Sequence, residues 1–278
     1  MSVSSSDTLG NYEDKEKILY KSKIKKKFPY NPIEVFKSFN NLKKPQIIKL
    51  SLSAIIIILF AIFNNVQITG NPQPVNKCYF DEVHKWTNPI NYYYRGNDGF
   101  RIFFQISATL SLDIVFIYSL YSWAIYGVDW RLGISVMLFY GIRYIMNELA
   151  RLNYPELFYF PNPGFPTIVT SYIEGSDFFY SGHSGFPIIN MMEFIWMKKY
   201  WFAAFCAYVS FVEVFMVIIT RNHFTIDVIV GVSFAHYISI QGRYYVKFIY
   251  DKIEFLKKLK DKNRKELKRI KLDWDIGD

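Results

Sequence analysis

Cysteine is scarce in this sequence, and its two cysteines are poorly placed to pair. The chain of 278 residues contains only Cys78 and Cys206. Cys206 lies within an apolar block, whereas Cys78 lies in a connecting segment rich in proline and asparagine. A disulfide requires its two α-carbons to lie within about 7 Å of each other, so we predict that no intrachain disulfide forms.

Amphipathic repeats and short alternating segments are also missing. Apolar residues make up 51% of the chain, and they form long unbroken blocks. The lack of amphipathic repeats argues against a soluble domain, and the lack of alternation argues against a transmembrane barrel. A membrane-spanning helix needs about 20 mostly apolar residues. In lipid, only helices or closed barrels give every backbone N–H and C=O group a hydrogen-bond partner. The sequence therefore predicts an all-α, polytopic membrane protein.

Apolar blocks long enough to span a membrane occur six times. They cover residues 47–66, 100–126, 131–150, 181–200, 201–220 and 223–248. They form a predicted six-span catalytic membrane domain at residues 47–248. A basic tail precedes this domain at residues 1–46, and a Lys-rich amphipathic helix follows it at residues 249–278. The connections at 67–99 and about 149–180 are rich in turn-forming residues and are expected to be irregular.

Positive charge is concentrated at the two ends of the chain. The net charge is +9, with eleven lysines through residue 50 and ten Lys or Arg from residue 249 onward. Lys198 and Lys199 lie in the turn between the fourth and fifth spans. Basic residues favour the cytoplasmic side of a membrane, so both tails are predicted to be cytoplasmic. We attribute their charge to an anionic membrane surface and expect no nucleic acid partner.

Two histidines and an aspartate are predicted to form a catalytic site. His183 lies at the start of the fourth span, and His223 follows 40 residues later, which is the length of two spans. Both are therefore expected at one membrane face, the lumenal or exoplasmic one. Asp227 lies four residues beyond His223, on the same face of a helix, where it can hold one ring nitrogen and leave the other basic.

Such a set suits phosphoryl transfer without a metal or another cofactor. One imidazole attacks phosphorus, and the other exchanges a proton with the departing and entering alkoxides. Zinc is less favoured because only two histidines converge and Cys206 lies out of reach. Arg143, within the third span, and Arg221, beside His223, are candidates to bind the phosphate. The Ser181-Gly182 pair fits a helix start whose backbone N–H groups can face phosphate oxygens.

The remaining ionisable residues of the spans and the first lumenal connection are given lesser roles. Glu148, at the lumenal end of the third span, is a further candidate for the site. His84 and His236 are interpreted as structural. Asp113, Glu193 and Glu213 are interpreted as polar links between helices.

Two motifs in this sequence resemble those of a known superfamily, the lipid phosphatases and phosphotransferases of phosphatidic acid phosphatase type 2. The stretch "DFFYSGHS" resembles the D-x-x-x-S-G-H-T motif of sphingomyelin synthases, with Ser184 in place of threonine, and it adds Asp177 and Ser181 as substrate-binding candidates. The stretch "TRNHFTIDVIVGV" resembles the T-R-x-H-Y-T-I-D and Val-Gly-Val pattern of plant phosphatidylcholine:diacylglycerol cholinephosphotransferases, with Phe224 in place of tyrosine.

The resemblance implies six spans, a lumenal or exoplasmic site, and specific roles for the three residues. It implies that His223 is the nucleophile, that Asp227 is its partner, and that His183 is the acid and base. The Lys-x6-Arg-Pro and Ser-Arg-x5-His patterns of the phosphatases are absent, which argues against a simple lipid phosphatase.

The expected activity is transfer of phosphocholine from phosphatidylcholine to diacylglycerol. The alternatives are transfer to ceramide, giving sphingomyelin or ceramide phosphoethanolamine, hydrolysis, and a non-catalytic membrane role. The expected location is the endoplasmic reticulum or Golgi, or else the plasma membrane. The headgroup, the acceptor, the organelle and the oligomeric state stay open.

Overall fold

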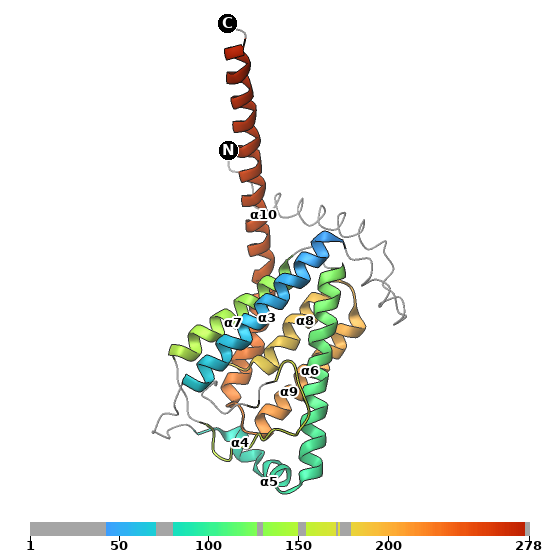
Figure 1. The fold of residues 1–278 in the computed structure, drawn as a ribbon. Coiled ribbons are helices and arrows are strands. Elements are labelled where there is room, and N and C mark those ends of the chain that lie inside the picture. The colour runs from blue at the N-terminus through green and yellow to red at the C-terminus, as the bar shows by residue number, and fades with distance from the viewer. Residues whose placement is uncertain are drawn as a thin grey trace, which may run out of the picture. The chain divides into compact units, whose positions relative to one another are not determined.

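A computed structural model describes residues 43–70, 80–126, 130–149, 154–170, 172 and 179–275 (Figure 1). All regular secondary structure in these ranges is helical. The helices are α3 (Lys44–Gly70), α4 (Glu82–Trp86), α5 (Asn88–Gly96), α6 (Asp98–Tyr126), α7 (Arg131–Leu149), α8 (Gly182–Trp196), α9 (Tyr200–Ile219) and α10 (Thr225–Asp275). The predicted all-α class is therefore confirmed. The tail at residues 1–42, Cys78 and Asp177 lie outside the described residues, and Cys206 is a buried free thiol.

Two of the described helices, α6 and α9, are long and apolar enough to cross a membrane. This finding supports membrane association, but it does not reach the predicted count of six spans. Helix α8 has only 15 residues, so it is about 22 Å long, shorter than the roughly 30 Å hydrocarbon core. The six-span count therefore stays a prediction.

The described residues fall into two compact units, which lie within residues 1–59 with 118–129 and within residues 60–117 with 130–278. In the first unit, the start of α3 contacts the end of α6. Gln46 Nε2 donates to the carbonyl of Ile125 at 3.0 Å, and Lys49 Nζ lies 5.0 Å from the centre of the Trp123 ring. The second unit contains all the candidate site residues.

Helices α8 and α9 form an antiparallel pair in the second unit. Near the turn that joins them, the rings of Phe194 and Phe202 lie 4.6 Å apart. Toward the other end, Ser210 Oγ donates to the carbonyl of Ser184 at 2.9 Å. These two contacts fix the register between the helices and bring the end of α9 beside the start of α8.

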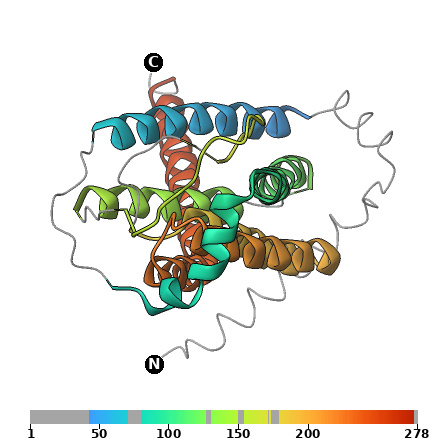
Figure 2. The same ribbon diagram turned by 90° about the horizontal axis from the view of Figure 1, so that it is seen from below.

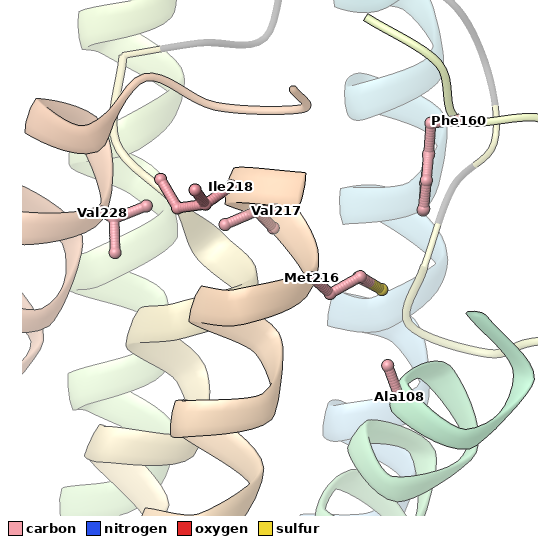
Figure 3. Close-up of a cluster of buried hydrophobic side chains, with 6 residues drawn as sticks. All are labelled: Ala108, Phe160, Met216, Val217, Ile218 and Val228. Atoms are coloured by element: carbon pink, nitrogen blue, oxygen red, sulfur yellow. The ribbon is translucent and has the colours of Figure 1, made fainter. Parts of the chain in front are cut away.

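A buried apolar cluster stabilises the end of α9 that leads to His223. It joins α9 to α6, α10 and the connection before α8, and its members are Ala108, Phe160, Met216, Val217, Ile218 and Val228 (Figure 3). Each of these side chains is at most 8% exposed. Because close-packed apolar side chains permit little movement, this cluster gives the turn after α9 a rigid base.

The connection predicted at 67–99 is not irregular throughout, because it contains α4 and α5. The Asp81 side chain caps α4 by accepting hydrogen bonds from the backbone N–H groups of Val83 and His84, and a proline begins α5. Such caps are strong helix signals even in short segments. The sequence prediction missed both helices because neither is long enough to show an apolar period.

The connection before α8 is irregular where it is described, as predicted. Polar side chains of α6 form hydrogen bonds with the backbone groups of this connection. Gln105 Nε2 donates to the carbonyl of Pro161 at 2.8 Å, and the Asp113 carboxylate accepts from the N–H groups of Ile168 and Val169 at 3.0–3.1 Å. Non-helical backbone beside a membrane-length helix requires such partners.

Helix α10 continues without a break through Ile249, where the sequence prediction began a separate helix (Figure 1). The sixth predicted span and the Lys-rich segment are therefore one 51-residue helix. The residues after Ile249 have high helix propensity and contain neither proline nor glycine until the last positions, so nothing local ends the helix there.

Candidate active site

His183 is placed at the start of α8 by a capped helix terminus. Ser181 is the N-cap residue, and its Oγ accepts a hydrogen bond from the N–H of Ser184 at 3.3 Å. Both ring nitrogens of His183 are buried, and neither has a hydrogen-bond partner among the described residues. A buried imidazole with no partner has both nitrogens available for a ligand or a proton.

His223 lies in the turn between α9 and α10, directly opposite His183. The centres of the two imidazole rings are 6.4 Å apart, and the ring planes make an angle of 60°. His223 Nδ1 lies 3.9 Å from Asp227 Oδ2, and the same Oδ2 accepts a hydrogen bond from the N–H of Phe224 at 3.0 Å. The structure thus brings together the three residues that the sequence prediction named as catalytic.

The start of α8 and the first turns of α10 are held together by backbone contacts. The N–H of Ser181 donates to the carbonyl of Asp227 at 3.0 Å. A Cβ atom on Gly231 would lie 2.6 Å from the Ser181 carbonyl oxygen, and one on Gly185 would lie 3.0 Å from the Gly231 carbonyl oxygen. Glycine at these two positions allows the approach that sets the separation of the histidines.

Arg143 approaches the site from α7. The side chain is buried, and its Nε donates to the carbonyl of Tyr180 at 2.8 Å. Its charge acts electrostatically on both His183 and Asp227. One turn further along α7, Asn147 Oδ1 accepts a hydrogen bond from the N–H of Phe179 at 3.1 Å. Arg143 is thus a cation beside the histidines, as a phosphate-binding residue must be.

The segment that carries α4 clamps the turn that carries His223. Asp81 accepts hydrogen bonds from the N–H of Thr225 at 2.6 Å and from its Oγ1 at 2.9 Å. His84 Nε2 lies 3.0 Å from the carbonyl oxygen of His223, and its ring stacks on Phe224 with the centres 5.9 Å apart. Figure 2 shows α4 and α5 beside the end of α9 and the start of α10.

The sequence prediction treated His84 as structural and did not single out Asp81. The only sequence signal for this pair is an aspartate and a histidine three residues apart in a connection assigned to the same membrane face as His223. That spacing is common and does not indicate a function by itself, so only the fold shows that the two residues contact the turn that carries His223.

The clamp pairs an ionised carboxylate with a neutral imidazole. Burial tends to raise the pKa of Asp81, but the hydrogen bonds from Thr225 and the nearby His84 outweigh it and hold the pKa below its usual 3.8. Burial, assisted by the charge of Arg221, lowers the pKa of His84 below 6.5 despite the opposing effect of Asp81. At neutral pH the Nε2–H of an uncharged His84 can therefore donate to the His223 carbonyl.

Arg221 is bound to the protein rather than directed into open space. The side chain is fully buried. Its Nη1 donates to Thr87 Oγ1 at 2.7 Å, and its Nη2 donates to Asn88 Oδ1 at 2.7 Å and to the carbonyl of His84. These contacts tie α4 and α5 to the turn that carries His223. Phosphate binding by Arg221 stays an untested prediction.

The structure does not show substrate binding for the other three candidates. Glu148 is exposed at the end of α7. The Ser181 hydroxyl is used as the α8 cap, and Asp177 falls outside the described ranges. Within those ranges, no group of three or more His, Cys, Asp or Glu side chains is arranged to hold a metal ion. The absence of a metal from the chemistry stays a prediction.

Fold and site together describe a helical protein that has two helices long and apolar enough to cross a membrane and a buried His-His-Asp cluster. A model of the AtPDCT1/2 family, the plant phosphatidylcholine:diacylglycerol cholinephosphotransferases, matches residues 85–241, more than half of the chain. The chain belongs to this family, as the resemblance in the two motifs indicated. Family membership implies a lipid-modifying phosphotransferase that acts on phospholipid and diacylglycerol. Searches of curated proteins and of solved structures return no match.

Proposed function

We propose that this protein moves phosphocholine from phosphatidylcholine to diacylglycerol through a covalent phosphohistidine at His223. The observation that carries the proposal is the 6.4 Å separation of the His183 and His223 rings, with Asp227 behind His223. Two imidazoles at this separation can reach one phosphoryl group from opposite sides. Family membership supports the class of lipid, and the geometry supports the proposed division of roles.

In the first step, Nε2 of His223 attacks the phosphorus of phosphatidylcholine. The N–P bond forms as the P–O bond to the glycerol oxygen breaks, and the departing alkoxide takes a proton from the cationic ring of His183. In this mechanism Nδ1 of His223 carries the ring proton. Nδ1 lies 3.9 Å from Asp227 Oδ2, and the Asp227 carboxylate stabilises the charge that develops on the ring. The nearby cation Arg143 offsets the negative charge on the phosphoryl oxygens.

In the second step, another diacylglycerol occupies the place of the first product. Its hydroxyl gives a proton to His183 and attacks phosphorus, and the N–P bond breaks. This restores His223 and the protonated His183, so every bond and proton is balanced over the cycle. Because donor and acceptor use the same site in turn, the kinetics should be of the ping-pong type.

The proposed topology has six spans, with both tails cytoplasmic and the histidines at the lumenal or exoplasmic face. Single cysteines at Asn222 and Ser5 test it, in a chain whose natural cysteines are replaced. A membrane-impermeant thiol reagent should label Asn222 only from the lumenal side, and Ser5 only from the cytoplasmic side. Labelling of Asn222 from the cytoplasm would place the site on the wrong face.

The activity itself is tested with purified protein in defined liposomes. The donor is phosphatidylcholine labelled in its choline, and the acceptor is diacylglycerol whose acyl chains differ from those of the donor. Labelled phosphatidylcholine with the acceptor's acyl chains is the expected product. Transfer only to ceramide, release of free phosphocholine without acceptor product, or no turnover would each reject the proposal.

A further inference from the structure

Glu213 is a buried carboxylate that the proposed reaction does not use. It lies within α9, an otherwise apolar helix of 20 residues. The side chain is fully buried, and neither carboxylate oxygen has a hydrogen-bond partner among the described residues. Burying a carboxylate without compensation is costly, and ionisable residues inside membrane helices mark functional sites by default. A ligand that brings positive charge would remove this cost.

The register of α8 and α9 places Glu213 at about the same depth as the start of α8. Ser210 bonds to Ser184, and Glu213 follows Ser210 by three residues, about 4.5 Å further toward the same end of the pair. Because the two helices are antiparallel, Glu213 is level with Ser181, the N-cap residue of α8, two residues before His183. The carboxylate is therefore at the depth of the proposed phosphoryl transfer.

The groups around Glu213 suit an organic cation. The carboxylates of Glu213 and Asp113 lie close enough to interact electrostatically, and both act on Tyr172. Asp113 is already bonded to the backbone of 168–169, which leaves Glu213 as the carboxylate without a partner. The Thr170 hydroxyl is buried and likewise without a partner in the described part of the chain.

An aromatic wall lies beside these carboxylates. The rings of Tyr172 and Phe160 are 4.9 Å apart, and both belong to the connection that Asp113 holds against α6. Carboxylates next to aromatic faces are the usual surroundings of quaternary and primary ammonium groups in proteins. An inorganic cation would instead favour a shell of oxygen ligands.

We infer that Glu213 binds the ammonium group of the donor lipid's headgroup while its phosphate lies between His183 and His223. This inference rests on the proposed function. In the bound state each charge of the zwitterionic headgroup lies near a side chain of opposite charge. Arg143 is near the negative phosphate, and Glu213 is near the positive nitrogen. Asp113 and Tyr172 are positioning residues that fix the wall of this subsite. Headgroup selection therefore depends on charge at Glu213.

The test compares three donor lipids in defined liposomes with diacylglycerol as acceptor. They are phosphatidylcholine, phosphatidylethanolamine and the phosphatidyl ester of 3,3-dimethylbutanol, a neutral isostere of the choline lipid. The wild type should favour phosphatidylcholine over the neutral isostere by roughly thirtyfold or more in kcat/KM, as expected for loss of one partner of a buried charge pair. Glu213→Gln should reduce this ratio to near one, and Glu213→Asp should retain part of it.

The matched control is Glu254→Gln, the same change on an exposed residue of α10 that pairs with Lys258. It should leave the ratio unchanged. Equal transfer from phosphatidylcholine and from the neutral isostere by the wild type would overturn the inference. A Glu213→Gln protein that keeps the wild-type ratio would overturn it as well. A rate that follows sodium concentration instead of headgroup charge would assign Glu213 to an inorganic cation. If the wild type transfers no headgroup at all, the proposed function itself fails, which is a different result.

Discussion

Gly231 on α10 and Ser181 before α8 are in backbone contact, so closely that a Cβ on residue 231 would lie 2.6 Å from the Ser181 carbonyl oxygen. Ser181 caps the helix that begins one residue before His183, and Gly231 lies one turn beyond Asp227. The distance between the two halves of the proposed site is therefore set by a glycine. The Ser181 carbonyl oxygen is a backbone atom, so it cannot avoid an added Cβ by a change of rotamer, as a side chain could.

Gly231→Ala should consequently reduce activity by more than the loss of folded protein can explain. The added methyl group must displace α8, and overpacking of this kind typically costs about 1–3 kcal/mol. Turnover should fall by more than tenfold, with loss of protein stability measured by thermal melting in detergent. Gly141→Ala on α7 is the control, because a Cβ there meets nothing within 4 Å. Equal activity of the two variants would refute the role given to this contact.

The Asp81–Thr225 contact should contribute to turnover. Asp81→Asn keeps a good helix cap for α4 but loses the charge that holds the N–H and hydroxyl of Thr225. A hydrogen bond to a charged group is worth about 1.5–3 kcal/mol, so kcat should fall roughly tenfold or more as His223 loses its fixed position. Initial rates should show little change in KM. A variant with wild-type kcat would show that the clamp is not needed.

The neutral state of His84 gives a pH dependence of stability with a definite sign. Burial lowers its folded-state pKa below the ordinary 6.5, so as the pH falls below about 6.5 the unfolded chain binds a proton that the folded chain excludes. The contribution of His84 is complete above pH 6.5 and is lost toward lower pH. Melting temperatures from pH 7.5 to 5 should therefore fall less in His84→Gln than in the wild type. Parallel curves would contradict this assignment.

The long helices α6 and α9 and the convergence of His183, His223 and Asp227 were predictable because they follow from apolar blocks and from regular spacings. Apolar blocks located α6 and α9, and the spacing from His183 to His223 together with the four-residue step to Asp227 identified the residues that converge. The clamp of Asp81 and His84 was not predictable, since it depends on how a connection with no apolar period folds onto a turn more than 130 residues away. Arg221 shows the same limit, because nothing in its sequence neighbourhood reveals that its guanidinium is bound to residues 84–88.

Arg131 and Glu193 should stabilise the protein without contributing to catalysis. Their buried side chains form two hydrogen bonds, of 2.8 and 3.1 Å, between α7 and α8, as expected of polar residues that link helices. Glu193 lies about 15 Å along α8 from His183. Glu193→Gln should lower the free energy of unfolding by about 3 kcal/mol, because it removes the carboxylate partner of a buried guanidinium. Replacing both residues by apolar ones should restore part of it, while activity per folded molecule stays constant.

The central claim is that His223 carries the headgroup between the two lipids. The most direct measurement is acid-labile, base-stable radiolabel on the protein after incubation with phosphatidylcholine labelled in its phosphate, without acceptor. Wild type should acquire label that unlabelled diacylglycerol removes, and EDTA should not prevent it. His223→Ala should acquire none, whereas His236→Ala, which changes an exposed histidine on α10, should label normally. Transfer of phosphocholine by His223→Ala, or loss of labelling in wild type on addition of EDTA, would contradict the mechanism.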